Sequence, residues 1–158
     1  MRRRGFKCRC RRGYTIVEMA VVVLLLGILA AIAAPKFQTA LSVQRVDAVA
    51  RRVAADLRLA RNYARKVSQS QTVTFDVSAE SYSMSSMPAL DRPSTVYSVS
   101  LTGTSQYYGE VVSADFGGAA NVQFDIYGRP NNAGSVTVRS SGRQKVVQVD
   151  GAGIVTIQ

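Results

Sequence analysis

The chain has 158 residues with 20 Lys+Arg against 10 Asp+Glu, a net charge of +10, and seven of the basic residues lie in the first thirteen positions. From Tyr14 onward, 13 basic minus 10 acidic residues leave only +3, which excludes a uniformly basic nucleic-acid-binding protein. The sequence has no His, and its two cysteines, Cys8 and Cys10, both lie in the basic leader. Because His is the commonest general base and metal ligand, we expect no enzyme, no catalytic residue, no cofactor and no metal site.

Residues 1–13 form a basic leader, and residues 14–35 are almost wholly apolar. The segment from Tyr14 to Ala34 contains Glu18 as its single charge and eleven Val, Ile or Leu residues, which favour membrane insertion by roughly 3–7 kcal/mol. As a helix it would be roughly 31 Å long, which matches the hydrocarbon core of a bilayer. We expect a single-pass span with the leader in the cytoplasm. An ordinary secretory signal peptide, cleaved after Ala33, is the alternative.

The helical pattern continues through residues 36–67, where apolar residues recur at spacings of three and four along one face. Pro35 is expected to kink the helix without ending it. One helix from about Tyr14 to Val67 would then be roughly 80 Å long. Its outer half is amphipathic, with the apolar positions Phe37, Leu41, Val46, Val49, Val53, Leu57, Ala60, Ala64 and Val67.

Residues 68–158 have the composition of an antiparallel β domain. Apolar residues alternate at Val73, Phe75 and Val77, at Val122, Phe124 and Ile126, at Val136 and Val138, and at Val147 and Val149. Turn sequences such as Ser141-Gly142 separate these runs, as in β-hairpins. The Ser-rich stretch 78–118 allows strands to be placed only loosely. The predicted fold class is α+β, a long transmembrane and amphipathic helix followed by a β-sheet head.

The boundary between leader and apolar segment carries a distinctive pattern. Glu18 lies one turn inside the span, where a buried and unpaired carboxylate costs at least a few kcal/mol. It could simply extend to the membrane interface. If the chain is instead cut after Gly13, the new α-amine of Tyr14 is a cation that can neutralise Glu18 between adjacent helices.

This pattern resembles the cleavage and methylation signal of type IV pilins and type II secretion pseudopilins. The resemblance covers residues 12–35, and Glu18 and Pro35 are the fifth and twenty-second residues counted from Tyr14. It implies cleavage after Gly13 by a prepilin peptidase, N-methylation of Tyr14 and assembly through Glu18 and Pro35. It also implies a bacterial inner-membrane protein with a periplasmic head that joins a pseudopilus containing other pseudopilins or pilins.

The C-terminal part, from Phe124 to Val155, resembles minor pseudopilins of the GspH/FimT type, which implies two antiparallel sheets packed on the outer part of the helix. The last forty residues hold only Asp125 and Asp150 as acids, too few for a calcium site. The expected function is that of a minor pseudopilin in type II secretion. The alternatives are a minor type IV pilin of the FimT kind, in pilus assembly or DNA uptake, and a soluble β domain exported with an ordinary signal peptide.

Charge separates the head from the helix that precedes it. Residues 68–158 hold five basic and seven acidic residues, a charge of −2, so we do not expect DNA binding. Residues 36–67 hold eight basic and two acidic residues, or +6. This basic helix face could meet anionic lipid or the acidic surface of a neighbouring subunit, or could simply be solvated.

Overall fold

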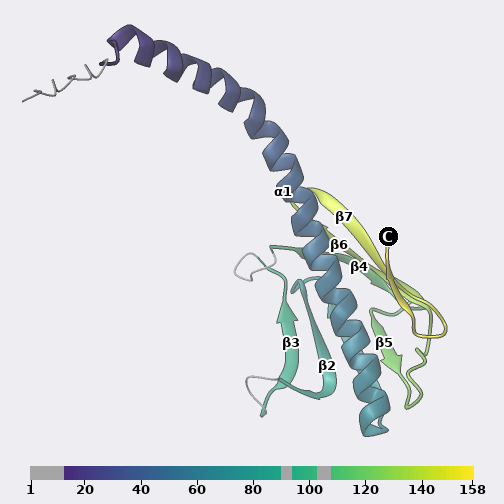
Figure 1. Cartoon of the computed structure of the whole chain (residues 1–158). Coiled ribbons are helices and arrows are strands. Elements are labelled where there is room, and N and C mark those ends of the chain that lie inside the picture. The colour runs from purple at the N-terminus through teal and green to yellow at the C-terminus, as the bar shows by residue number, and fades with distance from the viewer. Residues whose placement is uncertain (1–12, 90–93, 103–107) are drawn as a thin grey trace, which may run out of the picture. The chain divides into compact units, whose positions relative to one another are not determined.

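The computed structural model describes residues 13–89, 94–102 and 108–158. Most of the predicted leader, with Cys8 and Cys10, therefore lies outside the described residues. The chain divides into two compact units, residues 1–38 and 39–158, which we describe separately as the membrane unit and the head. One helix, α1 (Ile16–Val67), contributes to both units, and Figure 1 shows the strands that follow it. The long helix predicted from about Tyr14 to Val67 is confirmed, beginning two residues later.

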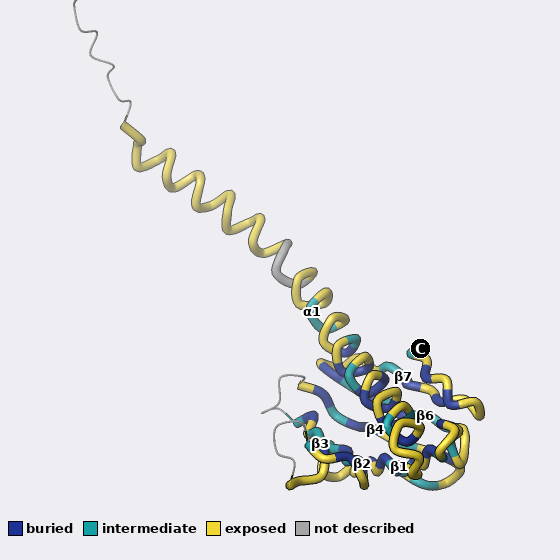
Figure 2. Tube along the Cα trace, turned by 60° about the horizontal axis from the view of Figure 1, so that its bottom comes forward, coloured by how far each residue is buried: buried dark blue, intermediate teal, exposed yellow. Residues whose placement is uncertain are grey.

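In the membrane unit, the residues of α1 from Ile16 to Ile32 are exposed on every face (Figure 2). Their length and hydropathy make α1 a candidate membrane span. A helix that is apolar all round is suited to lipid rather than to water. Pro35 lies within α1 and does not end it.

In the head, the same helix buries a single stripe. Six residues at spacings of three and four are no more than 2% exposed: Val46, Val49, Val53, Leu57, Ala60 and Ala64. Two further alanines beside the stripe, Ala50 and Ala54, are fully buried, and their small side chains let the sheets approach the helix closely. The predicted apolar face is thus confirmed from Val46 to Ala64; of its two end positions, Val67 is 40% exposed, and Phe37, which belongs to the membrane unit, is 71% exposed.

Eight strands follow the helix and form two antiparallel sheets of four strands each. The first has the order β3-β2-β1-β5, with β1 (Gln71–Asp76), β2 (Ser81–Pro88), β3 (Val96–Ser100) and β5 (Asn121–Phe124). The second has the order β4-β6-β7-β8, with β4 (Glu110–Asp115), β6 (Gly134–Ser140), β7 (Arg143–Val149) and β8 (Val155–Ile157). One hydrophobic core joins both sheets to the buried stripe of α1. The two-sheet head implied by the resemblance is confirmed.

Two details of the strand assignment differ from the sequence expectation. The stretch 78–118, where strands could not be placed firmly, contains β2, β3 and β4. In β2, the buried residues Tyr82 and Met84 alternate with Ser81, Ser83 and Ser85, which are partly or fully exposed, so small polar residues occupy the outer face of that strand. The strand expected through Ile126 ends at Phe124, and Ile126 is 44% exposed, because the chain turns at Asp125.

Candidate functional site

The residues of the predicted cleavage signal lie at the start of α1. Gly13, Tyr14 and Thr15 precede the helix. Tyr14 is 75% exposed, and nothing lies within 4 Å of the position that a Cβ at Gly13 would take. The peptide bond between Gly13 and Tyr14 is therefore in an exposed, non-helical segment, which is the form a peptidase needs.

Glu18 has a local role that the sequence reasoning missed. Its backbone amide donates a hydrogen bond to the Thr15 hydroxyl oxygen at 3.2 Å, so Thr15 caps the N-terminus of α1. Thr15 and Glu18 form the Thr-x-x-Glu pattern of a capping box, and a carboxylate in the first turn also interacts favourably with the helix dipole. Glu18 is exposed, so its side chain remains available to a cation from another chain.

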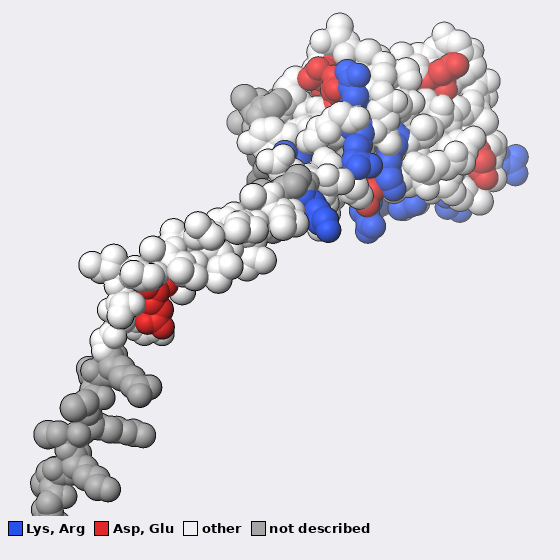
Figure 3. Space-filling view, turned by 90° about the horizontal axis from the view of Figure 1, so that it is seen from above, with Lys and Arg blue, Asp and Glu red and all other residues white. Residues whose placement is uncertain are grey.

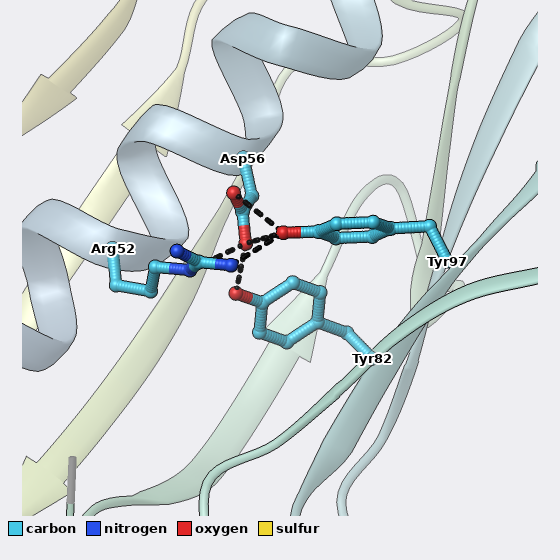
Figure 4. Close-up of polar contacts among 4 residues, drawn as sticks. All are labelled: Arg52, Asp56, Tyr82 and Tyr97. Atoms are coloured by element: carbon cyan, nitrogen blue, oxygen red, sulfur yellow. Dashed lines mark hydrogen bonds and ion pairs between the residues drawn. The ribbon is translucent and has the colours of Figure 1, made fainter. Parts of the chain in front are cut away.

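A second polar site is buried in the head, between α1 and the first sheet (Figure 4). Asp56 of α1 is 4% exposed. Its carboxylate accepts hydrogen bonds from Arg52 Nε at 3.0 Å, from the Tyr82 hydroxyl at 2.5 Å and from the Tyr97 hydroxyl at 3.2 Å. These four residues, the Asp56 cluster, join one turn of the helix to β2 and β3.

Electrostatics in the Asp56 cluster keep the phenols protonated and the guanidinium charged. Burial, followed by the negative charge of Asp56, raises the pKa of Tyr82 far above its ordinary value. Burial and Asp56 likewise raise the pKa of Tyr97. For Arg52, burial opposes the charge, but Asp56 and the two phenols together raise its pKa. A carboxylate that three donors already hold, beside phenols that do not ionise, stabilises the fold and does not supply a base or nucleophile.

Two turns in the head share one hydrogen-bonding pattern, in which an Asp carboxylate accepts the backbone amides of the residues two and four positions later. Asp125 Oδ1 accepts the amides of Tyr127 at 2.9 Å and Arg129 at 2.7 Å. Asp150 Oδ1 accepts the amides of Ala152 at 2.9 Å and Ile154 at 2.7 Å. These Asp-x-x-Gly turns explain both acids as turn formers. Among the described residues, no group of three His, Cys, Asp or Glu could hold a metal ion.

The two Asp-x-x-Gly turns meet at the helix. Gly128 and Gly153, the fourth residues of the turns, both have a φ of +77°. A Cβ at Gly153 would lie 2.3 Å from the Gly128 carbonyl oxygen, and a Cβ at either glycine would touch the Arg61 side chain. The end of the first sheet, the β7–β8 turn and α1 are thereby held together. The repeated Asp-x-x-Gly spacing was visible in the sequence, but nothing in it indicated that the turns touch.

Several basic residues of the helix face are engaged within the head. Arg45 donates to the Ser141 hydroxyl at 3.5 Å, and Arg58 donates to the Val155 carbonyl at 2.7 Å. Asp47 of α1 forms an ion pair with Lys145 of β7 at 2.8 Å. The face is therefore only partly solvated, and it helps to dock the β6–β7 hairpin and β8 on α1.

Comparison with known protein families decides the family. The model of the type II transport protein GspH family matches residues 49–153, and that of the prokaryotic N-terminal methylation motif matches residues 8–34. The chain belongs to the GspH family. Members are structural pilin-like subunits, and the motif together with the apolar helix indicates anchoring in a membrane. The predicted resemblance is confirmed by two independent matches.

Solved structures support the fold. The chain is similar to two crystal forms of the type IV minor pilin FimU from Pseudomonas aeruginosa. In one, the TM-score is 0.56 at 12% identity, covering 73% of this chain and 89% of FimU. In the other, the TM-score is 0.53 at 11% identity, covering 71% and 91%. No curated protein sequence matches the chain significantly. The pilin-like fold is thus established by structure at low sequence identity.

Proposed function

We propose that the chain is a minor pseudopilin of a type II secretion system, which joins a short periplasmic filament through α1. The observation that carries the proposal is the arrangement along one helix. The helix α1 (Ile16–Val67) contains the apolar part of the methylation motif, which covers residues 8–34, and the first part of the GspH match, which begins at residue 49. An exposed apolar helix needs partners when it leaves the lipid, and neighbouring helices of the same kind supply them.

In this proposal, the precursor inserts with its leader in the cytoplasm and its head in the periplasm. A prepilin peptidase cuts after Gly13, and the new amine of Tyr14 is methylated. The exposed, non-helical segment from Gly13 to Thr15 supports this assignment, because the enzyme has access to the backbone without unwinding α1.

Glu18 would then act in assembly. Its carboxylate carries a negative charge on a helix whose surroundings are otherwise apolar, and the α-amine of Tyr14 on the same or an adjacent subunit is the nearest cation that processing creates. Neutralising the two in a low-dielectric environment favours the assembled over the isolated state. Pro35 is proposed to shape the helix for packing, since it removes one backbone hydrogen bond.

A minor type IV pilin is the second candidate, and the similarity to FimU favours it. Both systems use the same processing signal, so the two candidates share every step up to filament assembly. Deletion of the gene for this chain separates them. Loss of protein export would identify a secretion pseudopilin, and loss of piliation would identify a type IV minor pilin.

The intact mass of membrane-extracted protein tests the shared step. We expect a mature protein that begins at Tyr14. Its mass should exceed that of the unmethylated chain 14–158 by about 14 mass units, because methylation of the α-amine replaces one hydrogen by a methyl group. Gly13→Val should leave the precursor inserted but uncut, because a branched side chain obstructs the approach of the peptidase to the backbone. A mature chain that starts at Ala34 would identify an ordinary signal peptide and refute the proposal.

The role of Glu18 is tested with Glu18→Ala and Thr15→Ala. If Glu18 pairs with an amine, Glu18→Ala leaves insertion and cleavage intact but strongly lowers crosslinking to other pilin-like subunits. Thr15→Ala removes the cap, which costs about 1 kcal/mol, but keeps the carboxylate, so it should still assemble. Equal loss in both variants would show that Glu18 acts only through the helix N-terminus.

A further inference from the structure

A cleft of about 370 Å³ lies in the head between α1 and the edge of the second sheet, lined by Asp47, Arg51, Arg58, Lys145 and Ile157. Three cations and one carboxylate leave it with two positive charges. Lys145 is held by Asp47 at 2.8 Å. Arg51 is exposed and forms no ion pair with any described residue. Its positive charge helps to lower the pKa of Asp47, but it does so less than the hydrogen bond and the charge of Lys145.

The wall opposite the helix is β8, the edge strand of the second sheet. Val146 and Gln158 exchange both of their backbone hydrogen bonds, at 3.3 and 2.8 Å. In an antiparallel pair such residues alternate with residues whose amides and carbonyls point away from the partner strand. Val155 and Ile157, opposite Val149 and Val147, therefore direct their backbone groups away from β7. Arg58, a cleft residue, donates to the Val155 carbonyl at 2.7 Å, which shows that this edge faces the cleft.

We propose that this cleft binds an extended acidic segment of a neighbouring pilin-like subunit, with its backbone along β8 and its carboxylate on Arg51 and Arg58. The inference rests on the proposed function, since it names a contact of the assembled filament. Arg58 binds the Val155 carbonyl, but the backbone groups of Ile157, which also point away from β7, complement another peptide backbone, which neither a lipid headgroup nor a nucleic acid resembles. A guanidinium pair adjacent to that edge selects a carboxylate.

Charge and size agree with this occupant. Figure 3 shows Lys and Arg side chains close to one another over part of one face of the head, and the three cations among the five lining residues of the cleft attract an acidic partner. A volume of about 370 Å³ admits only a few residues of an extended chain. The net positive charge of the cleft attracts any acidic group, and the strand edge beside it is what favours an acidic side chain carried on an extended peptide.

Photocrosslinking of the full chain in its native host tests the inference. Ala55 is exposed and lies on the helix between Arg51 and Arg58, four and three residues away, so a photoreactive benzoyl-phenylalanine there reports on the cleft. We expect an adduct whose crosslinked peptide, identified by mass spectrometry, comes from another pilin-like subunit and contains Asp or Glu. Arg51→Glu should lower the yield about tenfold or more by introducing like charge.

Lys66→Glu is the matched control, because it makes the same charge change on an exposed residue of the same helix outside the cleft, and it should leave the yield unchanged. Replacing the acid of the mapped peptide by Lys should restore crosslinking to Arg51→Glu. Equal yields in Arg51→Glu and Lys66→Glu, or adducts only with lipid or DNA, would overturn the inference.

A second crosslinker at Val23, in the membrane unit, separates this inference from the proposed function. If its adducts with pilin-like subunits persist, only the cleft assignment fails; if they are absent too, the proposed function fails with it.

Discussion

The two parts of α1 show how differently one helix can satisfy its apolar residues. Between Ile16 and Ile32 every residue is exposed, whereas between Val46 and Ala64 one stripe is buried to 2% or less. The first part is stable only in lipid or against other helices, and the second is stable against its own sheets. The same secondary structure thus folds against its own sheets in one part and, in the function that we propose, serves assembly in the other. Substitutions chosen in pairs, one from each part, test this division.

The largest difference is expected for leucine. Leu57→Ala removes a side chain that is 1% exposed and should lower the free energy of unfolding of the head by about 3 kcal/mol. Leu25→Ala removes one that is 54% exposed and should leave it unchanged. Urea unfolding of the full chain in detergent, followed by tyrosine fluorescence, gives both values. Similar losses in the two variants would contradict the division.

Buried charge sharpens the same comparison within the head. Asp56→Ala removes the acceptor that Arg52 and two phenols share, and should lower the free energy of unfolding by about 3 kcal/mol. The loss should be somewhat smaller to the extent that water reaches Arg52, whose side chain is 34% exposed. Asp47→Ala breaks an ion pair with Lys145 in which the two side chains are 31% and 34% exposed, and should lower the free energy of unfolding much less, since water screens such pairs. A double-mutant cycle of Asp56→Ala with Tyr82→Phe checks the assignment, because coupled partners are not additive.

The Asp56 cluster also marks the limit of what the sequence could predict. The helix, its buried stripe and the hairpins follow from spacings of three, four and two, which are local. Asp56 lies three residues after Val53 and four before Ala60, so the spacing places this acid on the apolar stripe and Arg52 one turn earlier is a possible partner, but neither observation identifies its other partners. Its partners Tyr82 and Tyr97 are 26 and 41 residues away, and sheet pairing brings them together. The contact between Gly128 and Gly153 was hidden for the same reason.

Glycines provide a three-way test of where the chain is crowded. Gly153 and Gly142 share a φ of +77°, but a Cβ at Gly153 would lie 2.3 Å from the Gly128 carbonyl, whereas one at Gly142 meets nothing within 4 Å. Gly142→Ala should cost about 1 kcal/mol for the backbone conformation alone, and Gly153→Ala about 2 kcal/mol more. Gly27→Ala, in open space, should not destabilise. Equal costs at Gly142 and Gly153 would show that the two turns are not packed together.

The smallest effect is expected at alkaline pH. Burial and Asp56 raise the pKa of Tyr82, so the native state retains a phenol proton that the unfolded chain loses near pH 10. The contribution of Tyr82 to the free energy of unfolding is therefore fully present below pH 10. Above pH 10 it declines by up to about 1.4 kcal/mol per pH unit, the value for one proton. Urea titrations between pH 9 and 11 should show this decline in the parent chain and a shallower one in Tyr82→Phe, where Tyr97, whose pKa is also raised, keeps a part of it. Tyr14→Phe, at an exposed position of the membrane unit, is the control and should leave the slope unchanged. An equal slope in all three proteins would mean that the phenol of Tyr82 is not held by Asp56, so that this residue does not join the helix to the first sheet through a hydrogen bond.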